Sequence, residues 1–237
     1  LDRTGTVSVD TLATKLDTSR ETIRRDLAAL DRQGLARKFH GGARRMEQIP
    51  SEIDFMARMT ENVPEKRRIA EAAARLFNHG DTLFMDAGST TIFFAERLAQ
   101  LSGLTIITNC MGALRHLGGS ARVILLGGEY EAAGQETLGP LTETDLRRFR
   151  ADHVVLTVGA VHGDGILDYD LREASLARAM IAQARRVTVL ADHAKFDRPA
   201  VFEVAPLSRV ERMVTDRPPP PHIAEGLRAG GVQLILA

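Results

Sequence analysis

The sequence predicts an α/β protein, in which a small winged helix-turn-helix domain is followed by a larger, mainly parallel α/β domain. Near the N-terminus, two short helical patterns flank Asp17-Thr18, and a basic, strand-like hairpin follows them. From residue 82 onward, short apolar runs alternate with helical patterns. Charge is uneven: residues 1–45 hold ten Lys and Arg against six Asp and Glu, whereas the remainder holds 21 against 25. These three observations indicate two domains of different character.

The most informative stretch is the second helical pattern. Ile23, Leu27 and Leu30 recur at the spacing of one helix face, and the opposite face is basic. Thr18 or Ser19 can cap this helix, and Thr18 with Glu21 has the spacing of a capping box. Gly34 suits its end. We therefore expect a helix from about residue 19 to residue 33.

A shorter helix is predicted before it, and a wing after it. Residues 7–16 (VSVDTLATKL) carry apolar residues at helical spacing, with Asp10 as the expected cap. Residues 35–39 are strand-like, and His40-Gly41-Gly42 can turn. Residues 19–45 hold eight Lys and Arg against three acids. Such a surface suits phosphates. The alternative is a solvated basic helix of an α/β enzyme.

The rest of the chain predicts a parallel sheet covered by helices. Residues 46–63 form the expected linker, so the domains are expected at 1–45 and 64–237. Strands are predicted at residues 82–85, 104–108, 122–126, 153–158, 186–190, 210–215 and 232–236. Helices are predicted at residues 65–78, 90–100, 111–117, 142–150, 173–184 and 221–229.

Polar and glycine residues follow five of the predicted strands. The first strand leads into DAGSTT at residues 86–91, where a glycine, three hydroxyls and a helix start can hold an anion. The alternative is a plain capping turn. Four other strand ends carry Thr108-Asn109, Gly127-Gly128, Gly159-Ala160 and residues 191–196. Because ligands of open α/β sheets bind beyond the carboxyl ends of the strands, we expect a small-molecule pocket there.

Composition limits the other function classes. The chain has 237 residues, of which 44% are hydrophobic and 26% charged, as in soluble globular proteins. Its single cysteine, Cys110, excludes an intramolecular disulfide framework. No histidine is spaced three or four residues from another His or Cys, so we expect no metal and no cofactor. No apolar run approaches 18 residues, so we expect no membrane segment and a cytoplasmic protein.

The N-terminus lacks a helix that winged-helix domains ordinarily have. The sequence begins at Leu1, without a Met and without a helix ahead of the helix-turn-helix pattern. We expect that the numbering begins inside a longer chain, or that this first helix is absent.

Both parts of the chain resemble one family. The stretch VSVDTLATKLDTSRETIRRDLAALDRQGLARKFHGGA resembles the DNA-binding domain of DeoR-family bacterial transcriptional regulators. DAGSTT, TN, LLGG, GP at Gly139-Pro140, EASLARAMI from Glu173 and ADHAKF resemble the sensor domain of that family. The resemblance implies a sensor domain similar in fold to ribose-5-phosphate isomerase, and an effector that is a phosphorylated sugar or polyol.

Individual residues of both domains have expected roles. On the DNA side, the second helix is expected to touch bases or phosphates through Arg24 and Arg25, with Arg20 and Thr22, and the wing residues are expected to hold the DNA backbone. The DNA-contacting set is expected to comprise Ser19, Arg20, Thr22, Arg24, Arg25, Arg37, Lys38 and His40. In the sensor domain, the resemblance implies that the phosphate is held by Gly88, Ser89, Thr90 and Thr91, with Lys195 supplying positive charge. It also implies that the hydroxyl side is lined by Asp86, Asn109, Gly128 and Glu173. Gly159, at the end of the fourth predicted strand, is a further expected effector-binding residue.

One departure from the family pattern bears on catalysis. Many family members have Gly-Ala-Asp-Gly after the fourth strand, whereas Val161 stands here in place of the acid. Isomerase-type proton abstraction needs a positioned carboxylate, and the spacing of Asp164 and Asp168 gives no support for either acid.

We therefore predict a homo-oligomeric (dimeric or tetrameric) repressor of sugar metabolism that binds double-stranded operator DNA. The alternatives are a sugar-phosphate isomerase with an appended basic domain, and a winged helix that binds protein.

Overall fold

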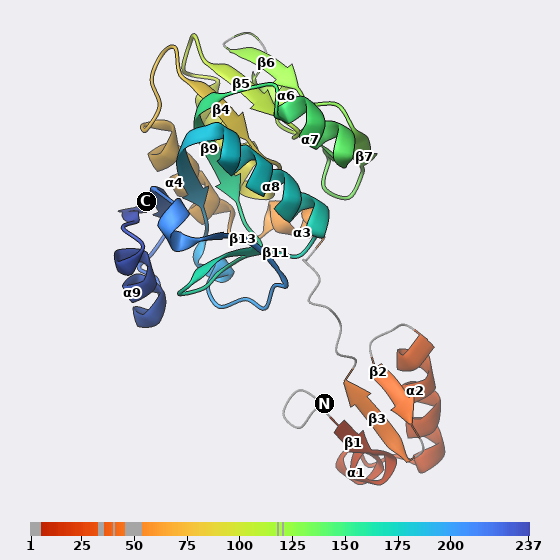
Figure 1. The fold of residues 1–237 in the computed structure, drawn as a ribbon. Helices are drawn as coiled ribbons and strands as arrows, with labels where there is room; N and C mark the ends of the chain where they lie inside the picture. The colour runs from red at the N-terminus through yellow and green to blue at the C-terminus, as the bar shows by residue number, and fades with distance from the viewer. Residues whose placement is uncertain (1–5, 33–35, 40, 46–53, 118, 120) are drawn as a thin grey trace. The chain divides into compact units, whose positions relative to one another are not determined.

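The computed structural model describes residues 6–32, 36–39, 41–45, 54–117, 119 and 121–237. The chain divides into two compact units, residues 1–49 and 50–237, each with its own hydrophobic core (Figure 1). The division falls inside the segment 46–63 expected as a linker. Helix α3 (Phe55–Thr60) occupies part of that segment, and its Phe55 is buried in the core of the second unit. Residues 54–63 therefore belong to the C-terminal unit.

The N-terminal unit is a helix-turn-helix followed by a β-hairpin. Its elements are β1 (Thr6–Ser8), α1 (Val9–Lys15), α2 (Arg20–Arg32), β2 (Ala36–Phe39) and β3 (Gly42–Arg45). The three strands form an antiparallel sheet in the order β1-β3-β2. Its core contains Val9 of α1 together with Ile23 and Leu27 of α2. Ile23 and Leu27 are two members of the predicted apolar stripe. Gly34 lies outside the described residues.

The first helix begins differently from the prediction. Residues 6–8 form strand β1, so the predicted helix over 7–16 is shorter at its start. Ser8, and not Asp10, is the N-cap, because the Thr11 amide donates to Ser8 Oγ at 3.0 Å. Asp10 is the second residue of the helix and lies in its first turn, where it interacts with Arg20 instead.

The C-terminal unit is built on one parallel sheet of seven strands. Their order is β15-β14-β12-β9-β4-β5-β6, and every neighbouring pair is parallel. The strands are β4 (Thr82–Met85), β5 (Thr105–Thr108), β6 (Arg122–Leu125), β9 (Ala151–Thr157), β12 (Ala184–Leu190), β14 (Arg212–Thr215) and β15 (Gln233–Leu236). All seven predicted strands are present, and the predicted α/β class is confirmed.

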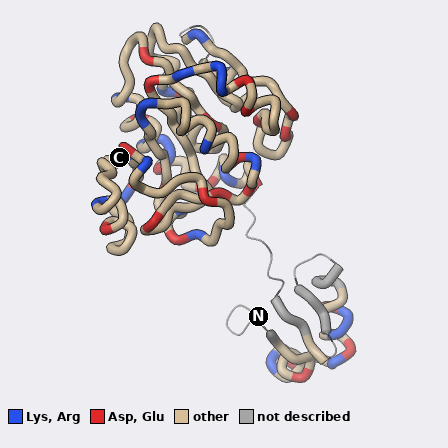
Figure 2. The backbone as a smooth tube through the Cα atoms, viewed as in Figure 1, with Lys and Arg blue, Asp and Glu red and all other residues tan. Residues whose placement is uncertain are grey.

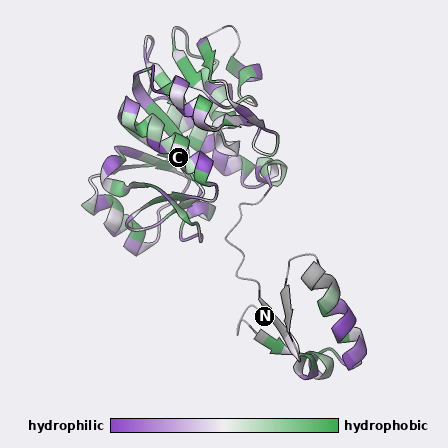
Figure 3. Ribbon diagram, turned by 45° about the vertical axis from the view of Figure 1, so that its right-hand side comes forward, coloured by the Kyte–Doolittle hydropathy of each residue, from purple (hydrophilic) through white to green (hydrophobic). Residues whose placement is uncertain are grey.

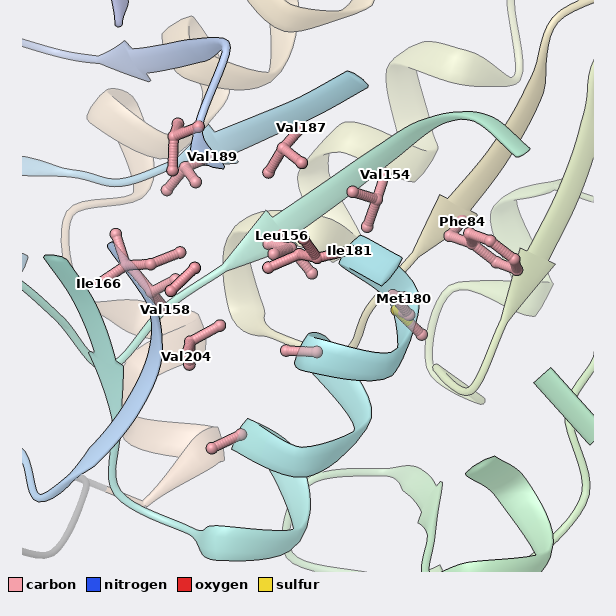
Figure 4. Packing of buried hydrophobic residues seen from close by; sticks show 14 of the residues in the cluster. Phe84, Val154, Leu156, Val158, Ile166, Met180, Ile181, Val187, Val189 and Val204 are labelled. Atoms are coloured by element: carbon pink, nitrogen blue, oxygen red, sulfur yellow. The ribbon is translucent and has the colours of Figure 1, made fainter. Parts of the chain in front are cut away.

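Helices cover both faces of this sheet, as the apolar strands require. One core contains Leu83 and Met85, and packs against α3, α4 (Val63–Ala74), α5 (Ser89–Leu98) and α6 (Leu114–Leu117). The other contains Phe84, the residue between them, and packs against α7 (Pro140–Leu146), α8 (Leu171–Gln183) and α9 (Pro221–Ala229). Figure 4 shows Met180 and Ile181 of α8 beside Val154 and Leu156 of β9.

Several short strands were not predicted from the sequence. β7 (Glu129–Glu131) pairs with β8 (Glu136–Leu138), and β10 (Ala160–Val161), β11 (Gly165–Asp168) and β13 (Phe202–Pro206) form a small antiparallel sheet. They lie between the elements of the main strand–helix alternation, so the alternation that located the seven parallel strands did not reveal them. Within the predicted helix over 111–117, only Leu114–Leu117 is helical.

Surface and core differ in the expected way. In Figure 3, hydrophobic residues mark the strands and alternate with hydrophilic ones along the helices. In Figure 2, acidic and basic residues are interspersed over the C-terminal unit. Across the described ranges, the helices are all too short or too polar to cross a bilayer.

Gly226 of α9 provides a test of this packing. A Cβ at this position would lie 1.9 Å from the carbonyl oxygen of Gly163, on the loop after β10. We expect Gly226→Ala to lower the free energy of unfolding by about 1–3 kcal/mol, because the backbone of that loop must shift. Gly127→Ala, where an added Cβ meets nothing within 4 Å, is the matched control. Equal urea midpoints for the two variants would contradict the packing described here.

Candidate functional site

The basic face of α2 is exposed. Ser19 caps this helix, since the Thr22 amide lies 3.1 Å from Ser19 Oγ. The two hydroxyls are themselves 2.9 Å apart. Arg24 Nη1 lies 3.7 Å from Glu21 and Arg25 Nε lies 3.9 Å from Asp26, and both arginine side chains are more than half exposed. Because exposed ion pairs contribute little, these guanidinium groups can exchange their partners for phosphate at small cost.

Arg20 differs from these two arginines. Its Nε lies 2.7 Å from Asp10 Oδ1, so it joins the second helix of the motif to the first. The wing residues Arg37 and Lys38 lie on β2, where Arg37 is in register with Arg44 of β3. His40 lies outside the described residues.

A pocket opens at the carboxyl ends of the central strands of the C-terminal unit. It occupies about 540 Å³, including its open mouth. Its lining comprises Arg58, Asp86, Ala87, Ser89, Thr90, Asn109, Glu136, Thr157, Val158, Gly159, Asp168, Glu173, Leu176, Ala177, Leu190 and Lys195. Seven of the ten predicted effector residues are brought together here: Asp86, Ser89, Thr90, Asn109, Gly159, Glu173 and Lys195.

Two predicted residues shape the pocket wall without lining it. Gly88 precedes α5, and a Cβ there would lie 2.0 Å from Thr157 Oγ1. Only glycine therefore allows the loop after β4 to approach the end of β9. Thr91 is fully buried, and its hydroxyl donates to Asp86 Oδ1 at 3.2 Å.

Gly128 does not line the pocket. A Cβ at this position would lie 2.0 Å from Thr142 Oγ1 and 2.7 Å from the Leu138 carbonyl oxygen. Close packing of this position against β8 and α7 therefore leaves no room for a side chain. The strand before it, β6, is the edge strand of the sheet, which sets Gly128 away from the central strand ends that line the pocket.

Asp86 is the most deeply fixed carboxylate of the site. Its two oxygens accept from the Thr157 amide at 3.1 and 2.9 Å, which ties the end of β4 to the end of β9. Burial raises the pKa of Asp86 well above its usual value, and the hydrogen bond from Thr157 opposes this change only in part. The protein thus holds an acid there that resists ionisation.

Glu136 and Asn109 form a second buried pair. Asn109 Nδ2 donates to Glu136 Oε2 at 2.9 Å and to the Thr137 carbonyl at 3.1 Å. Burial raises the pKa of Glu136 to about 7, while the Asn109 hydrogen bond lowers it and Asp168 raises it further. Asn109 Oδ1 is buried and has no hydrogen-bond partner among the described residues. A ligand hydroxyl could donate to this oxygen.

Asp168 corrects the interpretation drawn from the sequence spacing. Val161 pairs with Ile166 in the β10–β11 hairpin, and this hairpin returns the chain so that buried Asp168 lines the pocket. Asp164 lies at the exposed turn. The sequence distance between Val161 and Asp168 therefore hid an acid that the hairpin brings back to the site.

Besides Asp168, which was considered but not supported by its spacing, sequence reasoning missed three polar residues of the lining: Arg58, Glu136 and Thr157. Arg58 lies in α3, within the expected linker, and Glu136 lies in a three-residue strand. Thr157 is the last residue of β9 and the penultimate residue of the predicted strand over 153–158, where a polar residue could have been recognised as a further strand-end group. Within the described ranges, no three His, Cys, Asp or Glu side chains are arranged to hold a metal ion.

Comparison with known proteins decides the family. Residues 1–49 match the DeoR-like helix-turn-helix domain, and residues 61–217 match the DeoR C terminal sensor domain. The chain belongs to the DeoR family of transcriptional regulators. The resemblance predicted from the sequence motifs is therefore confirmed in both units.

Relatives in the DeoR family span nearly the whole chain. The HTH-type transcriptional repressor CsqR of Escherichia coli is 34% identical over 235 residues, covering 98% of this chain and 90% of CsqR. The glycerol-3-phosphate regulon repressor of the same organism is 34% identical over 238 residues, covering 98% and 93%. The L-fucose operon activator of Haemophilus influenzae is 30% identical over 239 residues, covering 100% and 96%.

Solved structures of similar fold include two kinds of protein. A D-ribose-5-phosphate isomerase in complex with phospho-erythronic acid has a TM-score of 0.40 and 15% identity, covering 55% of this chain and 52% of the isomerase. Translation initiation factor eIF-2B of Pyrococcus horikoshii has a TM-score of 0.44 and 16% identity, covering 82% and 68%.

The raised pKa of Glu136 predicts a pH-dependent stability. Its pKa is about 7 in the folded protein, against an ordinary value of 4.5, so the native state binds this proton more tightly than the unfolded state does. The contribution of Glu136 to stability is therefore highest below pH 4.5, falls as pH rises to 7, and stays low above pH 7. From pH 5 to pH 8, we expect the free energy of unfolding of Glu136→Gln to rise by roughly 2.5 kcal/mol relative to that of wild type.

This prediction is checked by urea denaturation at both pH values. Glu225→Gln, at an exposed position on α9, controls for loss of one carboxylate. If Glu136→Gln differs from wild type by the same amount at pH 5 and at pH 8, Glu136 is ionised throughout and the assignment is wrong.

Proposed function

We propose that this DeoR-family regulator is a repressor of a sugar or polyol catabolic operon, and that a phosphorylated sugar or polyol in the pocket modulates its affinity for operator DNA. The polarity of the pocket carries this proposal. Ser89 and Thr90 begin α5, and Arg58 and Lys195 add positive charge. The same pocket also holds carboxyl groups and an amide, which suit hydroxyls. A phosphate joined to a polyhydroxylated chain satisfies both sets.

The phosphate part follows from electrostatics. The first amides of a helix and its dipole favour an anion, and the hydroxyls of Ser89 and Thr90 can donate to it. An anion alone would be repelled by the acids Asp86, Glu136, Asp168 and Glu173. The pKa of Glu136, raised to about 7, reduces this repulsion, because a protonated carboxyl carries no charge and can donate to a ligand oxygen.

The DNA part rests on α2 and the wing. A helix with exposed Arg24 and Arg25 suits the major groove, and the basic hairpin β2–β3 suits the backbone beside it. One winged helix buries too little surface for operator-level specificity, so a dimer or tetramer that reads repeated half-sites is part of this proposal. A cytoplasmic location accompanies it.

The relatives support a sugar-related role. One of them is named for the glycerol-3-phosphate regulon and another for the L-fucose operon. The first is a repressor and the second an activator, so the family contains both kinds of regulator. Repression is therefore a more specific claim of this proposal than DNA binding or regulation. An effector that changes operator affinity tenfold needs a coupling free energy of about 1.4 kcal/mol, which is ordinary for allosteric proteins.

Glu136 favours a second candidate function, that of a sugar-phosphate isomerase. A pKa of about 7 is what a general base for proton abstraction requires, and Asp168 is a further acid in the same pocket. We propose that these groups bind and do not catalyse, because Val161 stands where many family members have the acid. Turnover of ribose 5-phosphate that Glu136→Gln abolishes would establish the enzyme instead.

The effector class can be tested on the full chain by thermal shift with phosphorylated sugars and polyols and their unphosphorylated parents. A ligand at 100 times its Kd adds about 2.7 kcal/mol to the stability of the native state. We expect a phosphorylated compound to raise Tm, and Thr90→Ala and Lys195→Ala to abolish the shift. Thr144→Ala, at an exposed position on α7, is the matched control. Shifts with unphosphorylated compounds only would overturn the phosphate assignment.

The DNA assignment can be tested with an operator selected from random duplexes. If Arg24 or Arg25 contacts a base, we expect its replacement by Ala to weaken operator binding by about 1–3 kcal/mol. If it contacts a phosphate, we expect the replacement to reduce the slope of log affinity against log salt concentration by about 1. Arg75→Ala, an exposed arginine of the C-terminal unit, should leave both quantities unchanged. Unchanged affinity and salt slope in both α2 variants would show that this face does not bind DNA.

A further inference from the structure

Helix α3 is the first described element after the N-terminal unit, and it supplies a cation to the pocket. Nine residues separate the end of β3 at Arg45 from the start of α3 at Phe55. Arg58, in the middle of this helix, lines the pocket together with Lys195. A residue close in sequence to the DNA-binding unit therefore takes part in the lining of the effector site.

Three kinds of contact hold α3 in place. Phe55 is buried in the core, and the Arg58 guanidinium lies 5.5 Å from the centroid of its ring. Lys66, a buried residue of α4, donates from Nζ to the carbonyl oxygen of Arg58. Asn62, between α3 and α4, donates to Asp192 Oδ1 at 3.2 Å. These contacts fix the backbone of α3 next to the strand end that carries Lys195.

Positive charges gather at this end of the pocket. The pKa of Lys66 is lowered chiefly by burial, and repulsion by Lys195 and Arg58 lowers it further. Asp192 opposes this effect most strongly, and Glu61 also opposes it. Three cations that repel one another in a partly desolvated place are stabilised when an anion enters.

We propose that Arg58 binds the anionic group of the effector and thereby couples occupancy of the pocket to helix α3. This inference rests on the proposed function. It adds Arg58 to the effector-binding residues and α3 as the element that transmits occupancy of the pocket. The planar guanidinium can donate two parallel hydrogen bonds to a phosphate, which an ammonium group cannot do with the same geometry.

The coupling follows from linkage. An anion bound to Arg58 adds a contact between α3 and the pocket, so it stabilises the docked helix relative to any state in which α3 is displaced. By reciprocity, displacement of α3 lowers the affinity of the pocket for the effector by the same factor. Because α3 follows the segment that leads from the DNA-binding unit, the position of this helix links the two functions.

Hydrogen exchange of the full chain tests this proposal, with glycerol 3-phosphate as the probe and inorganic phosphate as the minimal anion. In wild type, the saturating probe is expected to slow exchange about tenfold in peptides covering residues 86–95 and 54–62. In Arg58→Ala, residues 86–95 are expected to remain protected at saturation, whereas residues 54–62 lose their protection. Arg68→Ala, an exposed arginine on α4, should behave as wild type.

A second variant and a second readout guard against misfolding. Arg58→Gln removes the charge but keeps a polar side chain, and it should give the same selective loss as Arg58→Ala. In both Arg58 variants, the saturating probe should no longer change the affinity for the selected operator, although it still protects residues 86–95.

The outcomes separate this inference from the proposed function. If residues 54–62 are protected equally in wild type and in both Arg58 variants, the role of Arg58 is wrong but the proposed function stands. The same holds if the probe protects residues 86–95 of wild type but not residues 54–62. If neither glycerol 3-phosphate nor inorganic phosphate protects either peptide, the proposal of a phosphorylated effector is wrong, and this inference fails with it.

Discussion

The hydrogen bonding of the partly buried Asp86 carboxylate is the constraint on which the sensor unit depends. Its oxygens accept from the Thr157 amide and the Thr91 hydroxyl, so a single side chain joins the end of β4, the end of β9 and the first turn of α5. An ionised carboxylate without such partners would be very costly in this place. The glycine at position 88 is required because any larger residue would collide with Thr157. The shape of the pocket floor therefore follows from satisfying the hydrogen bonds of one partly buried acid.

The pocket brings charged groups of both signs together. Acids with raised pKa values lie in it together with Arg58 and Lys195, and Lys66 lies close by. Protein interiors tolerate such groups when partners or altered protonation compensate them. A ligand that carries both an anion and hydroxyls supplies further partners for both kinds of group. An anionic group on such a ligand offsets the mutual repulsion of Lys66, Lys195 and Arg58.

The two units differ in how they hold their functional groups. The N-terminal unit has a small core around Val9, Ile23 and Leu27, and its arginines stand in exposed, weak ion pairs. Those guanidinium groups are ready to exchange partners, as contact with a polyanion requires. The sensor unit instead fixes its polar groups by burial and hydrogen bonds on rigid strand ends. This difference suits a surface that binds DNA and a cavity that selects a small molecule.

The sequence by itself determined the local patterns of this protein. Helical spacing located Ile23 and Leu27 in one core, alternation located the seven parallel strands, and DAGSTT marked the strand end that carries the pocket. These features depend on residues near one another in the chain, so their periodicity or spacing is visible without a structure.

Only the tertiary structure decided which distant residues complete the pocket. Asp168 reaches it because the β10–β11 hairpin returns the chain, and Glu136 because it meets Asn109 at 2.9 Å across 27 residues. Arg58 reaches it because burial of Phe55 draws part of the expected linker into the core. Gly128, at a strand end like the others, was excluded because its strand is at the edge of the sheet. Contacts between residues far apart in sequence leave no local pattern, and so packing alone settled them.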